Sequence, residues 1–297
     1  SASLAGLVTA DNGLTISPSN NVQLGGTLIQ NTFVDNAGYN FGFGSSNSLN
    51  GNNEFAFGSS NSSDINQSQQ FGDTNTISSG ASIFQLGNSN DSQNSTESIM
   101  TGFTNRIADM VRSYSYGSDN YADRSSNLFT YGVSNNISRS SDETFVFGIK
   151  NTLSEASNSY IIGRDNNLAN GTNNTNYVFG FNNTDTDTSS GNFIVGRDTQ
   201  MTNNVSKSFS FGNTNTLQKD GTILLGSNLI GDWSDSVILG TNDSNKYIIQ
   251  NNGDMVYGIN SAGGLAPQNS RGSAGQVLFT NGAGSTDYWG NVGSGLT

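Results

Sequence analysis

A short apolar strand that ends in glycine recurs about every fifteen residues through most of this 297-residue chain. The unit reads apolar-x-apolar-Gly, as in FVFG, YIIG and YVFG, and successive glycines lie 14 to 17 residues apart. The repeat glycines are Gly44, Gly58, Gly72, Gly87, Gly102, Gly117, Gly132, Gly148, Gly163, Gly180, Gly196, Gly212, Gly226 and Gly240. A period this short and this regular predicts a stacked repeat architecture rather than a domain closed around one central core.

A second feature of the unit is an asparagine three residues after the glycine, often followed two positions later by an aliphatic residue such as Leu153 or Leu168. The repeat asparagines are Asn47, Asn61, Asn75, Asn90, Asn105, Asn120, Asn135, Asn151, Asn166, Asn183 and Asn215. Glycine permits a positive φ, and asparagine tolerates the left-handed region and can bond its own backbone. Each Gly-x-x-Asn segment is therefore predicted to turn a corner.

The length of the unit indicates the shape of one coil. The apolar-x-apolar pattern has a period of two, which predicts a strand with its apolar residues facing inward, and the aliphatic after the asparagine begins a second such strand. Fifteen residues at about 3.3 Å each give a perimeter of about 50 Å, enough for two strands and two turns. We therefore predict an all-β fold: a β-solenoid, specifically a two-strand-per-coil β-roll of about 14 coils of 14–17 residues. Stacked asparagines are expected to bond one another between coils.

Three regions follow from where the repeat starts and stops. Residues 41–245 form the predicted β-roll, and residues 1–40 an N-terminal β cap or connector. Residues 246–297 are predicted to hold a hairpin, a linker and one more strand segment. The only helix-like stretch, 104–114, keeps the spacing of its flanking glycines, so we predict an ordinary coil there.

The two end regions carry their own turn signals. We predict a hairpin around Asp11–Gly13, two short strands around Gly25–Gly26, and a hairpin with its turn at Asn251–Gly253. One more strand pair, or a strand–loop–strand segment, is expected over residues 276–290, with Trp289 as its anchor.

The amount of apolar material predicts association between copies. Hydrophobic residues are 32% of the chain, a thin supply for a domain of this length. A core two side chains thick cannot cover aromatics as large as Phe145, Phe147 and Phe179, and the stack exposes strand edges at both ends. We predict a homotrimeric fibre with short β-hairpin caps, with the apolar strands turned towards the shared axis.

Composition and charge exclude several kinds of function. The net charge of −12 repels nucleic-acid phosphates and anionic lipid, and no apolar run is long enough to span a bilayer. We therefore predict no nucleic acid among the partners and no membrane insertion. The chain contains no Cys and no His, which excludes disulfides, Cys/His zinc sites and His- or Cys-based catalysis.

Acidic pairs leave one enzymatic hypothesis open, because glycoside-cleaving spikes use paired carboxylates. The candidates are Asp119/Asp123, Asp185/Asp187 and Asp232/Asp235. We favour the interpretation that these are loop carboxylates that keep a Gly- and Asn-rich fibre soluble. The prediction is accordingly no enzyme and no catalytic residue.

Metal ions and a host receptor are two further candidate ligands for the polar side chains. Asp and Asn oxygens suit calcium, but neither an EF-hand loop nor the Gly-rich calcium nonapeptide is present. We predict no cofactor and no metal, while an ion on a threefold axis stays open. The matching pairs Arg164-Asp165 and Arg197-Asp198 are either a receptor-contact strip or a cross-coil salt ladder, and we favour the ladder.

The repeat resembles a known family. The run SNSYIIGRDNNLANGTNNTNYVFGFNN is similar to the head repeats of YadA-like trimeric autotransporter adhesins, which build a left-handed β-roll trimer. The flanks ADNGLTISPSNNVQLGGTLIQNT and GSAGQVLFTNGAGSTDYW resemble segments of bacteriophage tail-fibre and other host-facing fibre proteins. This chain has larger aromatics than the adhesin heads and no heptad-repeat stalk, so the resemblance favours a virion fibre.

Four functions remain as hypotheses. The first is a structural fibre protein at the virion surface, a phage tail or head fibre, that projects from the particle and attaches it to the host. Its partners would be copies of itself, other virion or fibre proteins at its ends, and a glycan or protein receptor on the host surface. The alternatives are a bacterial trimeric adhesin at the cell surface, a curli-like functional amyloid subunit and a polysaccharide-degrading spike.

Overall fold

The computed structural model describes residues 14–16, 22–24, 40–139, 142–169, 175–185, 187–242, 245–250, 255–258, 276–279 and 288–291. These residues form strands and turns and no helix, as the repeat predicts. The chain divides into two units, Ser1–Tyr39 and Asn40–Thr297. No helix suited to crossing a membrane occurs in the described ranges.

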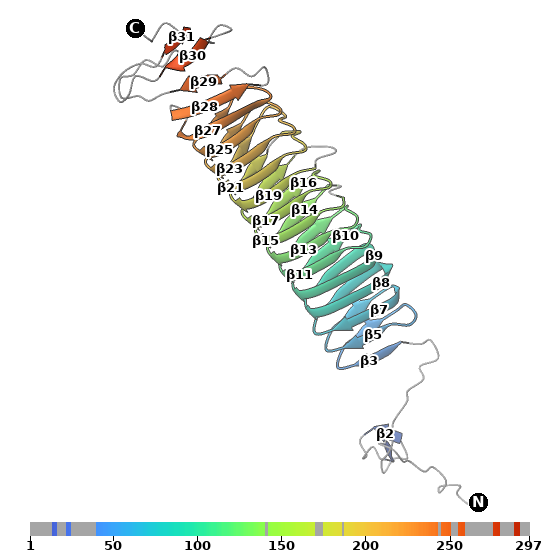
Figure 1. Cartoon of the computed structure of the whole chain (residues 1–297). Helices are drawn as coiled ribbons and strands as arrows, with labels where there is room; N and C mark the ends of the chain where they lie inside the picture. Colours follow the sequence, from blue (N-terminus) through green and yellow to red (C-terminus); the bar gives the residue numbers. More distant parts are fainter. Residues whose placement is uncertain are drawn as a thin grey trace, which may run out of the picture. The chain divides into compact units, whose positions relative to one another are not determined.

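The second unit contains a β-solenoid, drawn as a stack of short strands in Figure 1. Its first ladder consists of parallel strands that each carry an apolar-x-apolar-Gly unit. These strands are β3 (Phe41–Phe43), β5 (Phe55–Phe57), β7 (Asn66–Phe71), β8 (Thr76–Asn88), β9 (Asp91–Phe103), β11 (Tyr114–Ser118), β13 (Phe129–Val133), β15 (Phe145–Ile149), β17 (Tyr160–Arg164), β19 (Tyr177–Phe181), β21 (Phe193–Arg197), β23 (Phe209–Asn213), β25 (Ile223–Ser227) and β27 (Ser236–Asn242).

A second parallel ladder holds the short strands that follow the corner residues. They are β4 (Ser48–Leu49), β6 (Ser62–Ser63), β10 (Arg106–Ala108), β12 (Tyr121–Asp123), β14 (Asn136–Ser138), β16 (Thr152–Ser154), β18 (Asn167–Ala169), β20 (Thr184–Asp185), β22 (Gln200–Met201), β24 (Thr216–Leu217) and β26 (Ile230–Gly231). Strands β8 and β9 are long enough to belong to both ladders. The predicted β-solenoid with two strands per coil is therefore confirmed, with about 13 turns and a length of about 62 Å at about 4.8 Å per step.

The register keeps equivalent residues of successive coils side by side. Gly148, for example, pairs with Gly132 on one side and Gly163 on the other. The helix-like stretch 104–114 obeys the same register, because β10 pairs with β9 and β12. The prediction that this stretch is an ordinary coil is confirmed.

Several coils have a third, very short side that the flat two-sided prediction omits. Three left-handed residues mark the corners of one coil, as at Asp119, Arg124 and Asn127 with φ of 55°, 50° and 54°. Between the second and third corners one side chain points inward and is buried, such as Ser125 at 2% exposure in this coil. This short side closes the cross-section between the two ladders.

The segments turn as predicted, but the corner asparagines do not themselves use the left-handed conformation that this residue type tolerates. The left-handed residue is the one directly before, for example Ser134 with φ of 56° before Asn135, and Lys150 with φ of 55° before Asn151. Residues of many types adopt this left-handed conformation, because a φ near 55° is sterically allowed for any L-residue at a cost in free energy. The asparagine is therefore used for its amide rather than for its φ.

The predicted orientation of the apolar strand is also wrong. The buried residue is the middle one of apolar-x-apolar, so Val146 is fully buried while Phe147 is 44% exposed. A coil of this perimeter encloses only side chains of moderate size, such as Ile161, Ile194 and Leu153, and the aromatics lie outside. One aliphatic core runs along the axis from Met100 to Ile248.

The coils nearer the N-terminus have a polar interior instead. Gln70 and Gln85 occupy the inward middle position, and the Gln70 Nε2 donates to the Gln85 Oε1 at 2.9 Å. Ser63 and Ser68 share a hydrogen bond of 2.8 Å, and Ser68 Oγ donates to the buried carboxylate of Glu54. Apolar packing is correspondingly smaller in these coils, where only Ile65, Ile77 and Ile83 form a cluster.

Antiparallel pairing replaces the parallel stack after the last coil. Strand β28 (Asn245–Gln250) runs antiparallel to β27 and to β29 (Met255–Gly258), so the hairpin strands predicted from 246 onward are present, while their turn at Asn251–Gly253 lies outside the described residues. Strand β30 (Gln276–Phe279) pairs with β31 (Tyr288–Asn291), with Leu278 opposite Trp289.

In the first unit, β1 (Leu14–Ile16) pairs antiparallel with β2 (Val22–Leu24). This pairing joins one arm of the predicted hairpin around Asp11–Gly13 with the first of the two short strands predicted around Gly25–Gly26. The predicted turns at Asp11–Gly13 and Gly25–Gly26 lie outside the described residues.

The repeat glycines hold the coils at their closest approach, and this generates a test. A Cβ built on Gly148 would lie 1.7 Å from the carbonyl oxygen of Gly163, and the φ of Gly148 is 142°. We expect Gly148→Ala to lower the free energy of unfolding by at least about 1–3 kcal/mol from backbone strain alone. Thermal unfolding followed by circular dichroism measures the change.

A matched control is Gly42→Ala. Gly42 pairs in register with Ala56, and an added Cβ would meet its nearest atom at an ordinary 3.6 Å. Equal melting temperatures for the two variants would contradict the close-approach argument.

Candidate functional site: the corner ladder and the apolar face

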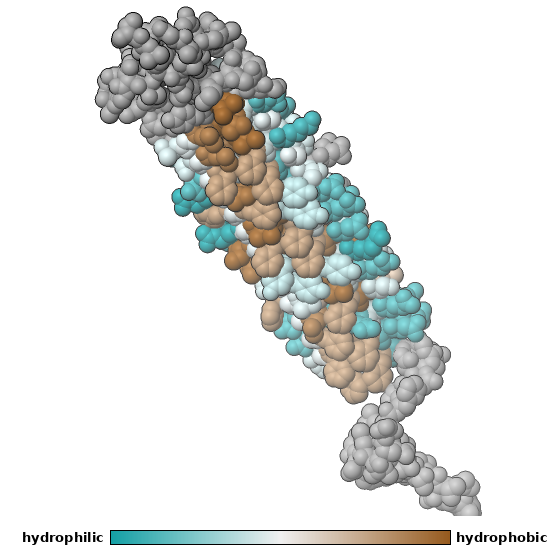
Figure 2. All heavy atoms as spheres, in the orientation of Figure 1, coloured by the Kyte–Doolittle hydropathy of each residue, from teal (hydrophilic) through white to brown (hydrophobic). Residues whose placement is uncertain are grey.

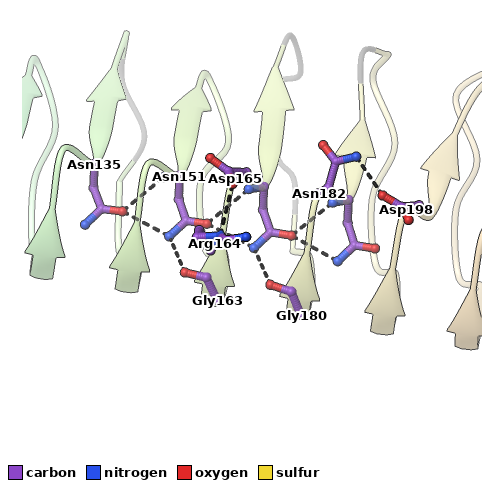
Figure 3. A network of polar contacts seen from close by, with 10 residues as sticks. Asn135, Asn151, Gly163, Arg164, Asp165, Gly180, Asn182 and Asp198 are labelled. Atoms are coloured by element: carbon purple, nitrogen blue, oxygen red, sulfur yellow. Dashed lines mark hydrogen bonds and ion pairs between the residues drawn. The ribbon is translucent and has the colours of Figure 1, made fainter.

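The corner asparagines form a continuous hydrogen-bonded ladder along the solenoid. Asn151 is typical: its backbone N–H and its Nδ2 both donate to the Oδ1 of Asn135, at 3.1 Å and 3.0 Å, and its Nδ2 also donates to the carbonyl of Gly163 at 3.0 Å. Asn166 repeats the pattern with Asn151 and Gly180. Figure 3 shows part of this ladder, with Asn135, Asn151, Gly163 and Gly180 labelled. Each amide from Asn61 to Asn183 thus bridges three coils, and the predicted Asn-on-Asn contact is present.

The ladder is unbroken for ten asparagines, from Asn47 to Asn183, and then stops at Thr199. The Thr199 backbone N–H still donates to the Asn183 Oδ1 at 3.0 Å, but the buried Thr199 hydroxyl has no hydrogen-bond partner. Asn215 is in the next coil and its Nδ2 bonds Ser210 Oγ and the Gly226 carbonyl instead. The structure therefore unites ten of the eleven predicted asparagines and separates Asn215 from them.

The repeat glycines lie in one row beside this ladder. Thirteen of them, Gly44 through Gly226, have φ between 112° and 155°, which L side chains rarely adopt. Gly240, the last of the fourteen, is absent from this positive-φ set and lies where β27 pairs with antiparallel β28. The row has a packing role, because each glycine allows the backbones of two successive coils to approach closely.

The Arg-Asp pairs are not cross-coil salt bridges, contrary to the interpretation favoured from the sequence. Arg164 Nε lies 3.1 Å from the Oδ2 of its own neighbour Asp165, and Arg197 has the same arrangement with Asp198. Phe181 separates the two arginines in the register, and the Arg164 guanidinium lies over its ring at 4.5 Å. The two pairs lie two coils apart, so each arginine has its own neighbouring aspartate, at a left-handed corner with φ of 56° or 57°, as its partner.

The acidic pairs are engaged in local structural contacts. Asp185 Oδ1 accepts from the Asp187 N–H at 3.2 Å, and Asp187 Oδ2 accepts from the Asn203 N–H at 2.7 Å. Asp123 forms an ion pair of 3.1 Å with Arg124. Asp119 is a left-handed corner residue, and so is Asp235. Within the described ranges no three acidic side chains gather where they could hold a metal ion.

Asp185 is unusual because it lies inside the coil. It is 1% exposed and pairs in register with Leu168 and Met201, which fill the same inward position. Desolvation by burial raises the pKa of Asp185 to about 7, although hydrogen bonds with Asp187 and Ser189 oppose the shift. Sequence spacing marked Asp185 only as half of a pair and gave no sign of its burial.

An apolar surface faces outward along the first ladder, whereas these residues were predicted to face inward. It is the largest difference between the sequence-based prediction and the structure. We define the apolar face as the first and third residues of each apolar-x-apolar unit, from β3 to β27. The first row is Phe41, Phe55, Gln69, Phe84, Ile99, Tyr114, Phe129, Phe145, Tyr160, Tyr177, Phe193, Phe209, Ile223 and Val237. The second row is Phe43, Phe57, Phe71, Leu86, Thr101, Tyr116, Tyr131, Phe147, Ile162, Phe179, Val195, Phe211, Leu225 and Leu239.

Figure 2 shows brown and tan side chains gathered in a band along the rod. Neighbouring rings stack from coil to coil, as in Tyr131–Phe147, with centroids 4.9 Å apart and planes inclined by 4°. The outer faces remain in water: Tyr131 is 48% exposed and Phe211 is 55% exposed. No position on the apolar face is Asp, Glu, Lys or Arg, although charged residues are 11% of the chain. A continuous exposed apolar band of this kind marks an interaction surface.

No family model matches this chain, and no curated protein is significantly similar to it. The candidate functional features are therefore the asparagine ladder, which is internal and structural, and the apolar face, which is external.

The break in the asparagine ladder at Thr199 leads to a testable prediction about stability. We expect Thr199→Asn to raise the free energy of unfolding by about 1–2 kcal/mol, because the new amide supplies hydrogen bonds to Asn183 and to the next coil. Thermal unfolding measures the gain. Thr199→Val is the matched control, since it removes the unpaired hydroxyl without adding an amide; equal stability of the two variants would contradict the role of the ladder.

The buried carboxyl group of Asp185 leads to a prediction about how the free energy of unfolding depends on pH. Its folded pKa of about 7 lies above the usual aspartate value of 3.8, so the folded state holds the proton more tightly. The associated stability is fully present below about pH 4 and is lost as the pH rises to about 7. At pH 8 the Asp185→Leu variant should be more stable than the parent chain by up to about 4 kcal/mol.

Urea unfolding at pH 4.5 and pH 8 measures this difference. The exposed carboxylate of Asp64 provides the control variant, Asp64→Asn. If Asp185→Leu and Asp64→Asn changed the pH dependence equally, the burial argument would be wrong.

Proposed function

We propose that this chain is a structural fibre protein of a virion, a phage tail or head fibre that projects from the particle and attaches it to the host surface. The observation that carries the proposal is the parallel stack of coils, held by the asparagine ladder over ten successive coils. Such a stack is a stiff spacer about 62 Å long. Its narrow core stabilises an elongated stack of small cross-section. A spacer of this kind suits a protein that holds a binding element away from a surface.

The proposed assembly is a homotrimer with residues 1–40 as connector and the C-terminal strands as cap. Antiparallel β28 occupies the edge of β27, where the next parallel coil would otherwise add, and β29 pairs with the other edge of β28. A covered edge favours a discrete particle over an open-ended curli-like polymer. Three copies would also present three receptor contacts at once, which raises the avidity for a glycan or protein on the host.

A bacterial surface adhesin built on the same solenoid is the second candidate. It shares the rod and the multivalent contact, and it differs in its location at the cell surface rather than on a virion. We propose no enzymatic activity for either form, because the acidic pairs named above are engaged with backbone N–H groups, with arginine or with a corner conformation.

Binding of the fluorescently labelled full chain to a panel of intact bacterial cells tests the proposal. We expect saturable binding to a subset of cells, and competition between the chain and phage adsorption to those same cells. The Gly148→Ala variant is the control, since it disturbs the stack with almost no change in composition. Absence of binding throughout the panel, release of reducing ends from the cell polysaccharide, or growth of open-ended fibrils would each overturn the proposal.

A further inference from the structure

We infer that the apolar face is the surface through which copies of this chain associate, in parallel and in register. This inference deepens the proposed fibre function by naming the interface, and it rests on the composition and dimensions of the face. Two outward rows on each strand give a band about 12 Å wide and about 62 Å long, or about 700 Å². A stable protein interface buries about 800 Å² on each partner, so one copy of this chain offers nearly the full area.

The chemistry of the face selects another copy of itself as the occupant. The chain carries a net charge of −12, yet the face holds no ionisable carboxylate, lysine or arginine. Only Gln69 and Thr101 interrupt the run of aromatic and aliphatic residues. A basic partner would find no charge to pair with there, whereas a second apolar face of equal length is complementary along its whole extent.

The position of Gln69 determines the direction of the copies. Gln69 is exposed on β7, the third strand of the ladder. In a parallel, in-register assembly the Gln69 side chains of neighbouring copies lie at the same level of the stack, where the two amides can bond. In an antiparallel pair it would face β23, where Phe209 and Phe211 supply no partner, and a buried amide without a partner is costly.

Single cysteines test this arrangement without ambiguity, because the chain contains none. Leu225 lies in the second-to-last strand of the ladder and is 37% exposed, and Phe57 lies in the second strand and is 46% exposed. In parallel copies two Leu225→Cys residues lie close together. In antiparallel copies Leu225→Cys lies close to Phe57→Cys instead, since the two positions are at equal distances from opposite ends.

The experiment treats the full-length variants with a short bis-maleimide and separates the products on a denaturing gel. We expect Leu225→Cys alone to give covalent dimers, and the Gln200→Cys control, exposed on the second ladder, to give none. Crosslinking only in the mixture of Leu225→Cys with Phe57→Cys would overturn the parallel arrangement. Absence of crosslinks in both cases would overturn self-association through this face.

Light scattering of the parent chain and of Phe147→Glu provides an independent readout. The parent is expected to have a multiple of the monomer mass of 31.2 kDa, and the variant to have the monomer mass with unchanged circular dichroism. A parent chain that is monomeric at micromolar concentration would contradict the inference. A parallel assembly that binds no cells would leave the interface standing and reject the attachment function alone.

Discussion

Close contact between the backbones of successive coils at the glycine corner is the constraint on which the rest of the structure depends. At Gly148 the neighbouring carbonyl occupies the space that a Cβ would need, at 1.7 Å. Only glycine allows this approach, and the approach brings the Gly163 carbonyl within 3.0 Å of the Asn151 amide. The corner therefore couples three coils through one side chain. Because the same geometry recurs at each level, the stack needs little apolar material to remain ordered.

The small cross-section has a direct consequence for the large side chains. The interior accepts one residue from the middle of each apolar strand, such as Val146 or Ile161, together with an aliphatic from the second ladder and one residue from the short third side. The strand period then turns Phe145 and Phe147 outward. The apolar face is thus a by-product of the coil size, and a chain with smaller outward residues could build the same solenoid without it.

Much of the fold was predictable from spacing, since the period of the glycines indicates parallel coils and the asparagines indicate a ladder. Which face of each strand is buried was not predictable, because apolar-x-apolar fits a half-buried strand in either orientation. The buried Ser, Asn or Thr that precedes most units, such as Ser159 or Asn176, is the signal that could have decided it. The third side escaped prediction because its left-handed corners at Arg124 and Asn127 carry no glycine. The ion pair of Arg164 depends on backbone geometry at Asp165 that spacing does not encode.

The change from a polar to an aliphatic interior along the axis affects how the rod carries load. Coils that contain Gln70, Gln85 and Ser68 gain little from the exclusion of water, whereas coils around Ile161 and Ile194 bury aliphatic side chains completely. Under tension, or at the onset of heating, the N-terminal coils should peel away first and leave the remainder of the rod intact. The solenoid would then have a compliant N-terminal part and a rigid C-terminal part, and separation would proceed in steps of single coils.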